Sequence, residues 1–307
     1  MAAASGVVAS WYRGAGLAQP MLRVATYKGD ITGFFAQAGI GVPDYGVREA
    51  EFVGGNLITE ALAGGDIDLG GMSEIPPLFA LRLAAAFRLI AVQRADVRAS
   101  QVVLLPKDSP IRHVAELRGR RVGYARATTS HYLLLRLLRE QGLGIDDVVS
   151  RPLRINDGFA AFQAGELDAW VTYGIGIQVA RARLGARVLA TGLGYLSGNY
   201  LFAARAGALA DTRLHAAIAD YLGRVDRAWR WRNRHPREWA AGMARLTGVE
   251  AERFLEWFHE ENEHGQLVRV DEAAIASLQG VADVFHADGV LPQAVDVRPL
   301  WATDFSF

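Results

Sequence analysis

Three consecutive hydroxyl side chains, Thr128, Thr129 and Ser130, form the turn with the clearest chemical potential in the sequence. They follow a short apolar run, Val122 to Ala125, and precede a segment in which leucines recur at helical spacing up to Gly142. Hydroxyl residues cap helices, and the first turn of a helix leaves backbone N–H groups unpaired and carries partial positive charge. The pattern predicts a strand, a turn and a helix whose start can hold a compact anion, although an ordinary threonine-capped connection has the same pattern.

Three other polar turns are predicted to follow strands, at Tyr27-Lys28-Gly29, Met72-Ser73-Glu74 and Tyr173-Gly174. Ligands of α/β proteins bind beyond the carboxyl ends of the strands, which is where such turns lie. One polar turn is a weak signal, but four turns that share this position indicate an anion-binding cleft.

Charged and polar neighbours complete the candidate site. Arg126 and Lys28 are placed to add positive charge at its mouth. We expect His131 to pack beside the ligand as a helix-start residue and not to act as a general base. A carboxylate would repel an anion, so we expect Glu74 to turn back and cap the helix that follows it. Asn199 lies at a predicted crossing between domains and joins the ligand-binding set.

The elements that must position these turns alternate between strand and helix, which is the pattern of parallel sheets covered on both faces by helices. A polar, proline-containing stretch after Leu105 predicts a crossing into a second domain, and a strand beginning at Tyr200 predicts the return. We therefore expect an α/β protein with a discontinuous first lobe over residues 21–105 and 200–307, and a second lobe over residues 106–199. The two crossings would act as a hinge that closes the lobes over a ligand.

Composition narrows the classes of function. The 307 residues have a formal net charge of zero, 51% hydrophobic and 21% charged residues, which is typical of a globular protein without a nucleic-acid partner. The absence of cysteine excludes disulfides, thiolate metal sites and a cysteine nucleophile. His259, Glu260 and His264 imitate a zinc-protease motif, but the second histidine is five residues after the first and points to another side of a helix. We expect no metal, no cofactor and no catalytic residue.

The first 20 residues are rich in alanine and glycine and lack the basic region of a complete signal peptide. Gly16-Leu17-Ala18 resembles a small-x-small cleavage site. We interpret residues 1–20 as the remnant of an export leader whose start lies upstream, which would place the protein in the periplasm. A disordered native tail is the alternative.

Several motifs occur in order between Leu22 and Trp301. They include Gly65-Asp66-Ile67-Asp68-Leu69-Gly70, Glu74-Ile75-Pro76-Pro77, Leu105-Pro106-Lys107-Asp108-Ser109-Pro110-Ile111, His131-Tyr132-Leu133-Leu134 and Asp168-Ala169-Trp170-Val171. Together they resemble the periplasmic aliphatic sulfonate-binding proteins of ABC importers. The resemblance implies the two-lobed periplasmic binding fold (type II), a small-molecule anion (a sulfonate) as ligand, and an ABC permease and ATPase as partners. We expect a monomer.

The same resemblance implies which residues contact the ligand. The ligand turns of the family fall on Tyr27, Met72, Ser73, Glu74, Thr128 and Thr129, and its aromatic shelf falls on Tyr173. The chain departs from the family's pattern at three places. Tyr27 stands where relatives have glutamine, Met72-Ser73 where they have threonine or glycine, and Tyr173-Gly174-Ile175 where they have Trp-Asp-Pro.

These departures make the expected pocket more apolar and leave more room beside the sulfonate. We therefore expect a bulky or aromatic tail in preference to taurine, whose ammonium needs a carboxylate partner. The alternative function is an enzyme of the same fold that acts on an organosulfur compound, such as a desulfinase-like hydrolase. Desulfinases use a cysteine, which this chain does not have.

Overall fold

The computed structural model describes residues 19–261 and 264–307, and these divide into two compact units. Unit 1 consists of residues 19–93, 200–232 and 266–307, and unit 2 of the described residues within 94–199 and 233–265. The predicted leader remnant or tail over residues 1–20 lies outside the described residues, apart from Gln19 and Pro20.

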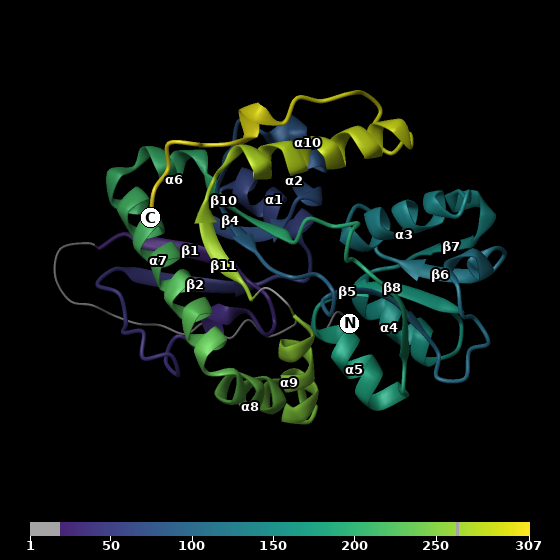
Figure 1. The fold of residues 1–307 in the computed structure, drawn as a ribbon. Helices are drawn as coiled ribbons and strands as arrows, with labels where there is room; N and C mark the ends of the chain where they lie inside the picture. The colour runs from purple at the N-terminus through teal and green to yellow at the C-terminus, as the bar shows by residue number, and fades with distance from the viewer. Residues whose placement is uncertain (1–18, 262–263) are drawn as a thin grey trace, which may run out of the picture. The chain divides into compact units, whose positions relative to one another are not determined.

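Unit 1 contains a six-stranded sheet with the strand order β11-β4-β10-β3-β1-β2 (Figure 1). Its strands are β1 (Met21–Thr26), β2 (Gly46–Glu51), β3 (Leu69–Ser73), β4 (Phe87–Arg94), β10 (Asn199–Arg205) and β11 (Gln266–Arg269). Strand β1 is parallel to β2 and β3, whereas β10 is antiparallel to β3.

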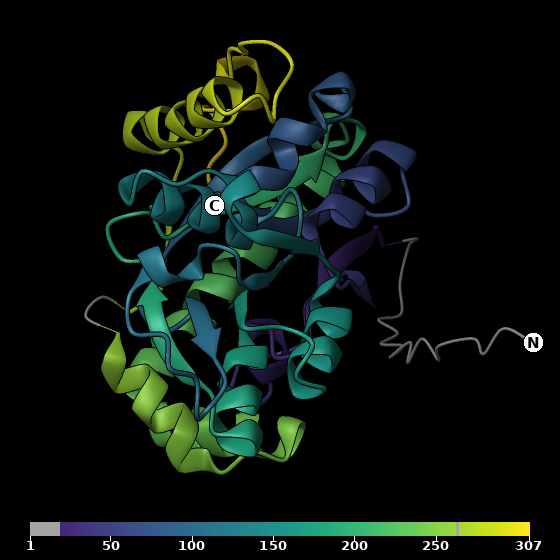
Figure 2. The same cartoon turned by 90° about the vertical axis from the view of Figure 1, so that its right-hand side faces the viewer.

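The helices of unit 1 are α1 (Gly55–Gly64), α2 (Ile75–Phe79), α6 (Ala206–Ala210), α7 (Thr212–Arg234) and α10 (Glu272–Ala287), with 3-10 helices at Ile31–Phe34, Leu81–Leu83 and Arg298–Leu300. Helices α2 and α10 pack together (Figures 1 and 2) through Phe79 and Phe285, whose ring centroids are 5.6 Å apart.

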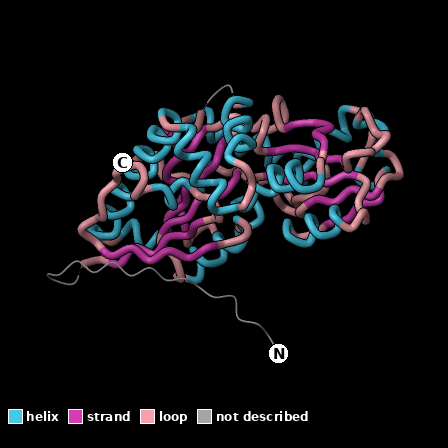
Figure 3. The backbone as a smooth tube through the Cα atoms, turned by 90° about the horizontal axis from the view of Figure 1, so that it is seen from below, coloured by secondary structure: helices cyan, strands magenta, loops and turns pink. Residues whose placement is uncertain are grey.

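Unit 2 contains a five-stranded sheet with the order β7-β6-β8-β5-β9. Its strands are β5 (Gln101–Leu105), β6 (Arg121–Tyr124), β7 (Val149–Pro152), β8 (Ala169–Tyr173) and β9 (Arg187–Thr191). Its helices are α3 (Thr129–Glu140), α4 (Ile155–Gln163), α5 (Ile175–Leu184), α8 (Pro236–Thr247) and α9 (Ala251–Glu260), with 3-10 helices at Val114–Leu117 and Ile145–Asp147. In each unit the sheet is flanked by helices, as the backbone trace in Figure 3 shows. None of the helices formed by the described residues is long and apolar enough to cross a membrane.

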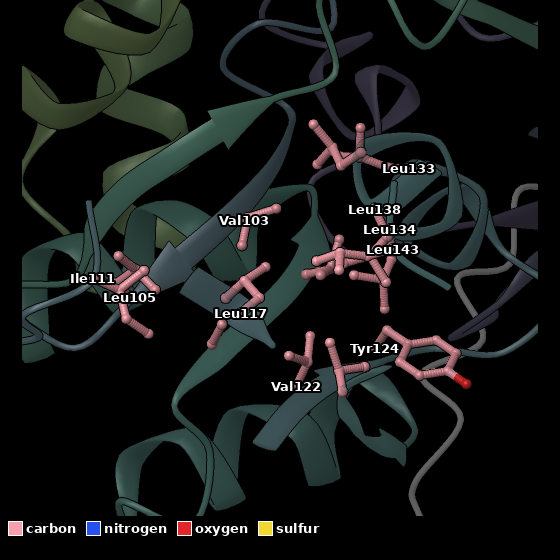
Figure 4. Packing of buried hydrophobic residues seen from close by; sticks show 14 residues of the cluster. Val103, Leu105, Ile111, Leu117, Val122, Tyr124, Leu133, Leu134, Leu138 and Leu143 are labelled. Atoms are coloured by element: carbon pink, nitrogen blue, oxygen red, sulfur yellow. The ribbon is translucent and has the colours of Figure 1, made fainter. Parts of the chain in front are cut away.

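The alternation of side chains along β5 divides the core of unit 2 into two layers. Val103 and Leu105 belong to the buried cluster that also contains Leu133 and Leu134 of α3 (Figure 4). The alternate residues of β5 lie on the opposite face, in a cluster with Trp170 of β8. Because successive strand residues point to opposite faces, one short apolar strand serves both layers. The sheet of unit 2 is thereby fixed from both sides, and with it the turns at its edge.

Strand β5 differs from the domain boundary expected from the sequence. The sequence pattern predicts residues 101–105 in the first lobe, but β5 lies in the sheet of unit 2, antiparallel to both β8 and β9. The alternation of strands and helices predicted parallel sheets, and both sheets are in fact mixed. A strand's direction depends on partners that are distant in the sequence, so local spacing does not reveal it.

Helices α8 and α9 also differ from the expected division, because they lie in unit 2. Arg181 of α5 forms an ion pair with Glu260 of α9 at 3.2 Å, and Arg183 donates to the carbonyl oxygen of Thr247 at 3.1 Å. The chain therefore passes between the units at four places instead of the two expected.

Candidate functional site

The turn between β6 and α3 is held by the side chain of Thr128, which is the N-cap of α3. Its Oγ1 accepts a hydrogen bond from the backbone N–H of Ser130 at 3.2 Å and donates to the carbonyl oxygen of Ala125 at 2.7 Å. Ala127 takes the left-handed backbone conformation, with φ of 58°. The predicted hydroxyl cap is therefore present, and the one proton of the Thr128 hydroxyl is used within the turn.

The neighbouring hydroxyl, on the buried Thr129, donates to Oε1 of Gln101 at 2.8 Å. Gln101 is the first residue of β5, and the antiparallel register pairs it with Tyr173 at the end of β8. It thus reaches the edge of the sheet where β6 and β8 end. Gln101 was not among the residues predicted from the sequence. Its place at the site follows only from the antiparallel direction of β5, which the sequence pattern does not show.

Tyr173 and Gly174 form the turn between β8 and α5. Burial raises the pKa of the Tyr173 phenol to about 12, in spite of a hydrogen bond with the side chain of Thr128 that lowers it. The phenol is therefore neutral at physiological pH and retains its proton. Gly174 is the N-cap of α5 and has φ of 71°, a conformation that residues with a Cβ rarely adopt. The structure thus brings Thr128, Thr129 and Tyr173 together with Gln101.

His131 lies in the first turn of α3, where its ring stacks on that of Tyr124 with centroids 5.0 Å apart. Burial, and secondarily the positive charge of Arg126, lower the pKa of His131 to about 4. The imidazole is therefore neutral at pH 7, which does not suit a general base that is poised near neutrality. Arg126 itself is exposed and supplies positive charge beside the turn.

In unit 1, the residues Tyr27 and Ser73 lie at the ends of β1 and β3. The hydroxyl of Tyr27 donates to the carbonyl oxygen of Gly71 at 3.2 Å, and its ring meets that of Tyr200 edge to face at 6.3 Å between centroids. Tyr200 pairs with Ser73 in the sheet. A Cβ at position 71 would lie 2.4 Å from the ring of Tyr200, so a larger residue there would force that ring to move. These contacts build an aromatic edge around a half-buried serine.

Two other predicted residues of unit 1 lie differently from expectation. Met72 is fully buried, so its side chain offers no surface to a ligand in this structure. Glu74 is the N-cap of α2, but its side chain makes no capping hydrogen bond. A capping side chain accepts from the N–H of the second or third helical residue, and in α2 these are Pro76 and Pro77, which have no N–H to donate. The expectation that Glu74 caps α2 is therefore corrected.

The two remaining candidates are Lys28, which is exposed after β1, and Asn199, which begins β10 and whose N–H donates to Oγ of Ser197 at 3.0 Å. Within residues 19–261 and 264–307, no group of three or more His, Asp or Glu side chains comes together that could hold a metal ion.

Comparison with known proteins gives a consistent result. The NMT1/THI5-like family matches residues 24–215. An aliphatic sulfonates-binding protein of Escherichia coli (strain K12) is 31% identical over 259 residues, which cover 83% of this chain and 79% of the relative.

Two solved structures share the fold over most of their length. The periplasmic aliphatic sulphonate-binding protein of Escherichia coli has a TM-score of 0.81 at 28% identity, covering 94% of this chain and 93% of that one. The alkanesulfonate-binding protein of Xanthomonas axonopodis pv. citri, bound to MOPS, has a TM-score of 0.84 at 26% identity, covering 93% and 99%. The predicted two-lobed α/β fold class and the resemblance are thereby confirmed. A desulfurization enzyme with a TM-score of 0.60 is 18% identical and shares the fold alone.

Proposed function

Since the chain belongs to the NMT1/THI5-like family, we propose that it is a solute-binding protein that captures an organosulfonate for an ABC importer. The similarity to sulfonate-binding proteins along most of the chain supports this function. We also propose that it acts in the periplasm, as a monomer that delivers its ligand to a permease and an ATPase.

The observation that carries the proposal is the chemistry of the turn at the start of α3. The side chains of Thr128 and Thr129 bond to Ala125, Ser130, Gln101 and Tyr173, and none of these partners is a carboxylate. A sulfonate is a permanent anion with three acceptor oxygens and no proton to donate, so it needs donors and positive potential only. The helix start and the exposed charge of Arg126 supply that potential.

The aromatic residues support a bulky or aryl tail on the ligand. Tyr173 lies beside Thr128 in unit 2, and the pair formed by Tyr27 and Tyr200 lies at the sheet edge of unit 1. An aromatic surface suits an apolar tail better than the ammonium of taurine. The relative bound to MOPS holds a sulfonate whose tail ends in a saturated morpholine ring, which supports room for a bulky tail and not an aromatic one.

We propose binding without turnover. The relatives with 26–31% identity are binding proteins, whereas the desulfurization enzyme is similar in fold alone. The chain has no cysteine to serve as a nucleophile. A stoichiometric incubation followed by mass spectrometry distinguishes the two functions, because a binding protein returns its ligand unchanged.

A thermal-shift panel of alkyl and aryl sulfonates, taurine, sulfate and nitrate tests the ligand class. A ligand that binds the folded state alone raises the melting temperature by mass action. We expect the largest shift with long alkyl or aryl sulfonates and a smaller one with taurine. The largest shift with taurine would contradict the proposed tail, and the largest shift with sulfate or nitrate would contradict the sulfonate.

Closure of the lobes over the ligand, which the predicted crossings between the domains indicated, stays a prediction. Small-angle scattering should show a lower radius of gyration for the ligand-saturated protein than for the free protein. An unchanged radius at saturation would speak against closure.

A further inference from the structure

The hydroxyl protons of Thr128 and Thr129 are both engaged within unit 2. Thr128 donates to the carbonyl oxygen of Ala125 at 2.7 Å, and Thr129 donates to Oε1 of Gln101 at 2.8 Å. A hydroxyl has a single proton to donate. Neither threonine can therefore donate to a ligand unless it first breaks a bond that the structure contains.

The bond from Thr129 leaves the other half of the Gln101 amide unused. With Oε1 as the acceptor, Nε2 retains two N–H donors, and these have no acceptor among the residues that the structure describes. The backbone of Gln101 is already paired, since its N–H donates to Val97 at 3.1 Å and its carbonyl accepts from Gly192 at 2.7 Å. Gln101 is thus held at its backbone and at Oε1, and its side-chain Nε2 group is available to donate to a ligand.

We propose that the side-chain amide of Gln101 is a ligand-binding donor for the oxyanion of the sulfonate, in place of the two threonine hydroxyls, and that Thr129 is the positioning residue that holds it. The inference rests on the proposed function and names a donor within the same site. An amide N–H pair suits a sulfonate, which only accepts hydrogen bonds. Because Gln101 is half-buried and Thr129 buried, the bond forms where water competes less.

Gln101→Glu is the sharpest test, because it keeps the shape of the side chain. The Thr129 hydroxyl can still donate to the new carboxylate, so the variant should fold, but the two N–H donors are replaced by a negative charge. At pH 8 we expect the affinity for hexanesulfonate, measured by calorimetry, to fall by about 100-fold or more. The matched control is Gln163→Glu at the exposed end of α4, which adds the same charge to unit 2 and should change the affinity by about twofold or less.

A second pair of variants tests the positioning role of Thr129. Thr129→Val removes the hydroxyl and should weaken the binding of hexanesulfonate by about tenfold. Thr129→Ser keeps a hydroxyl and should retain most of the wild-type affinity. In the wild type, the side-chain ¹⁵N–¹H resonances of Gln101 should shift when hexanesulfonate binds. In Thr129→Val this shift should be smaller even where the melting temperature of the free protein is unchanged.

The outcomes separate this inference from the proposed function. If the wild type binds hexanesulfonate and Gln101→Glu binds it within about threefold, the assignment of Gln101 is overturned while the proposed function stands. If the wild type binds no sulfonate at all, the proposed function fails and the assignment fails with it.

Discussion

Units 1 and 2 each contain an arginine–aspartate clamp built by the same hydrogen bonds. In unit 1, the backbone N–H and Nε of Arg23 donate to Oδ2 of Asp68, and Nη2 donates to Oδ1 at 2.7 Å. In unit 2, the corresponding groups of Arg121 donate to Asp168, with Nη2 to Oδ1 at 2.8 Å. Each guanidinium also donates to a glycine carbonyl, of Gly65 or Gly165. The aspartate thus ties the loop before one strand to the neighbouring strand in both units.

The two clamps differ in burial and in the number of cations. The side chain of Asp68 is 1% exposed and is shared with Arg205, whose Nη2 lies 2.7 Å from Oδ1. The side chain of Asp168 is 30% exposed and pairs with Arg121 alone among the described ion pairs. Burial acts to raise the pKa of Asp68, but the bonds from Arg23 and Arg205 outweigh it and hold the pKa below its usual value. For Asp168, the bond from Arg121 is the main cause of the lowered pKa.

The comparison indicates that the same local motif can contribute very different amounts to the free energy of unfolding. A buried carboxylate relies on its cations and hydrogen bonds to offset its desolvation, whereas a partly exposed one is stabilised by water as well. Three substitutions test this difference, and urea unfolding measures all of them.

Asp68→Ala should have the largest effect. It leaves Arg23 and Arg205 without their shared anion in a partly buried place, and we expect a loss of about 3–5 kcal/mol in the free energy of unfolding. A loss below about 1 kcal/mol would show that the buried clamp has no more weight than a surface ion pair.

Arg205→Ala makes the clamp of unit 1 resemble that of unit 2, because Asp68 keeps Arg23 as its single cation. We expect a loss of about 2 kcal/mol from the charged hydrogen bonds removed. If the variant is as stable as the wild type, the second cation is not needed to offset burial.

Asp168→Ala should have the smallest effect, about 1 kcal/mol, because water can solvate both partners once they are separated. A loss equal to that of Asp68→Ala would contradict the role given to burial. It would mean that the hydrogen bonds of the clamp determine its contribution to the free energy of unfolding, whether or not the aspartate is buried.

The sequence predicted the parts of the fold and site that depend on neighbouring residues. The hydroxyl turn forms the predicted cap of α3, with Thr128 as N-cap. Gly142, predicted to stop the helix, has φ of 66° two residues beyond the last helical residue, Glu140. Caps and stops are local interactions, so spacing and residue type suffice to find them.

The parts that could not be predicted depend on partners far apart in the chain. Gln101 reaches the site because β5 runs antiparallel to β8, and its bond to Thr129 spans 28 residues. The second cation of the buried Asp68 is Arg205, which lies 137 residues away. Neither contact can be predicted from the local spacing of apolar and polar residues. The missing cap at Glu74 was foreseeable, because Pro76 and Pro77 stand in the sequence and proline has no N–H.

The measurement that tests the central claim most directly is calorimetric titration with three matched compounds: hexanesulfonate, hexanol and sulfate. Hexanol carries the tail without the anion, and sulfate carries an anion without the tail. We predict one site per chain that binds hexanesulfonate with a dissociation constant of about 1 µM, which corresponds to about −8 kcal/mol, and far weaker binding of the other two. Absence of binding by hexanesulfonate, or equal binding by sulfate, would contradict the assignment of this protein as a sulfonate-binding protein.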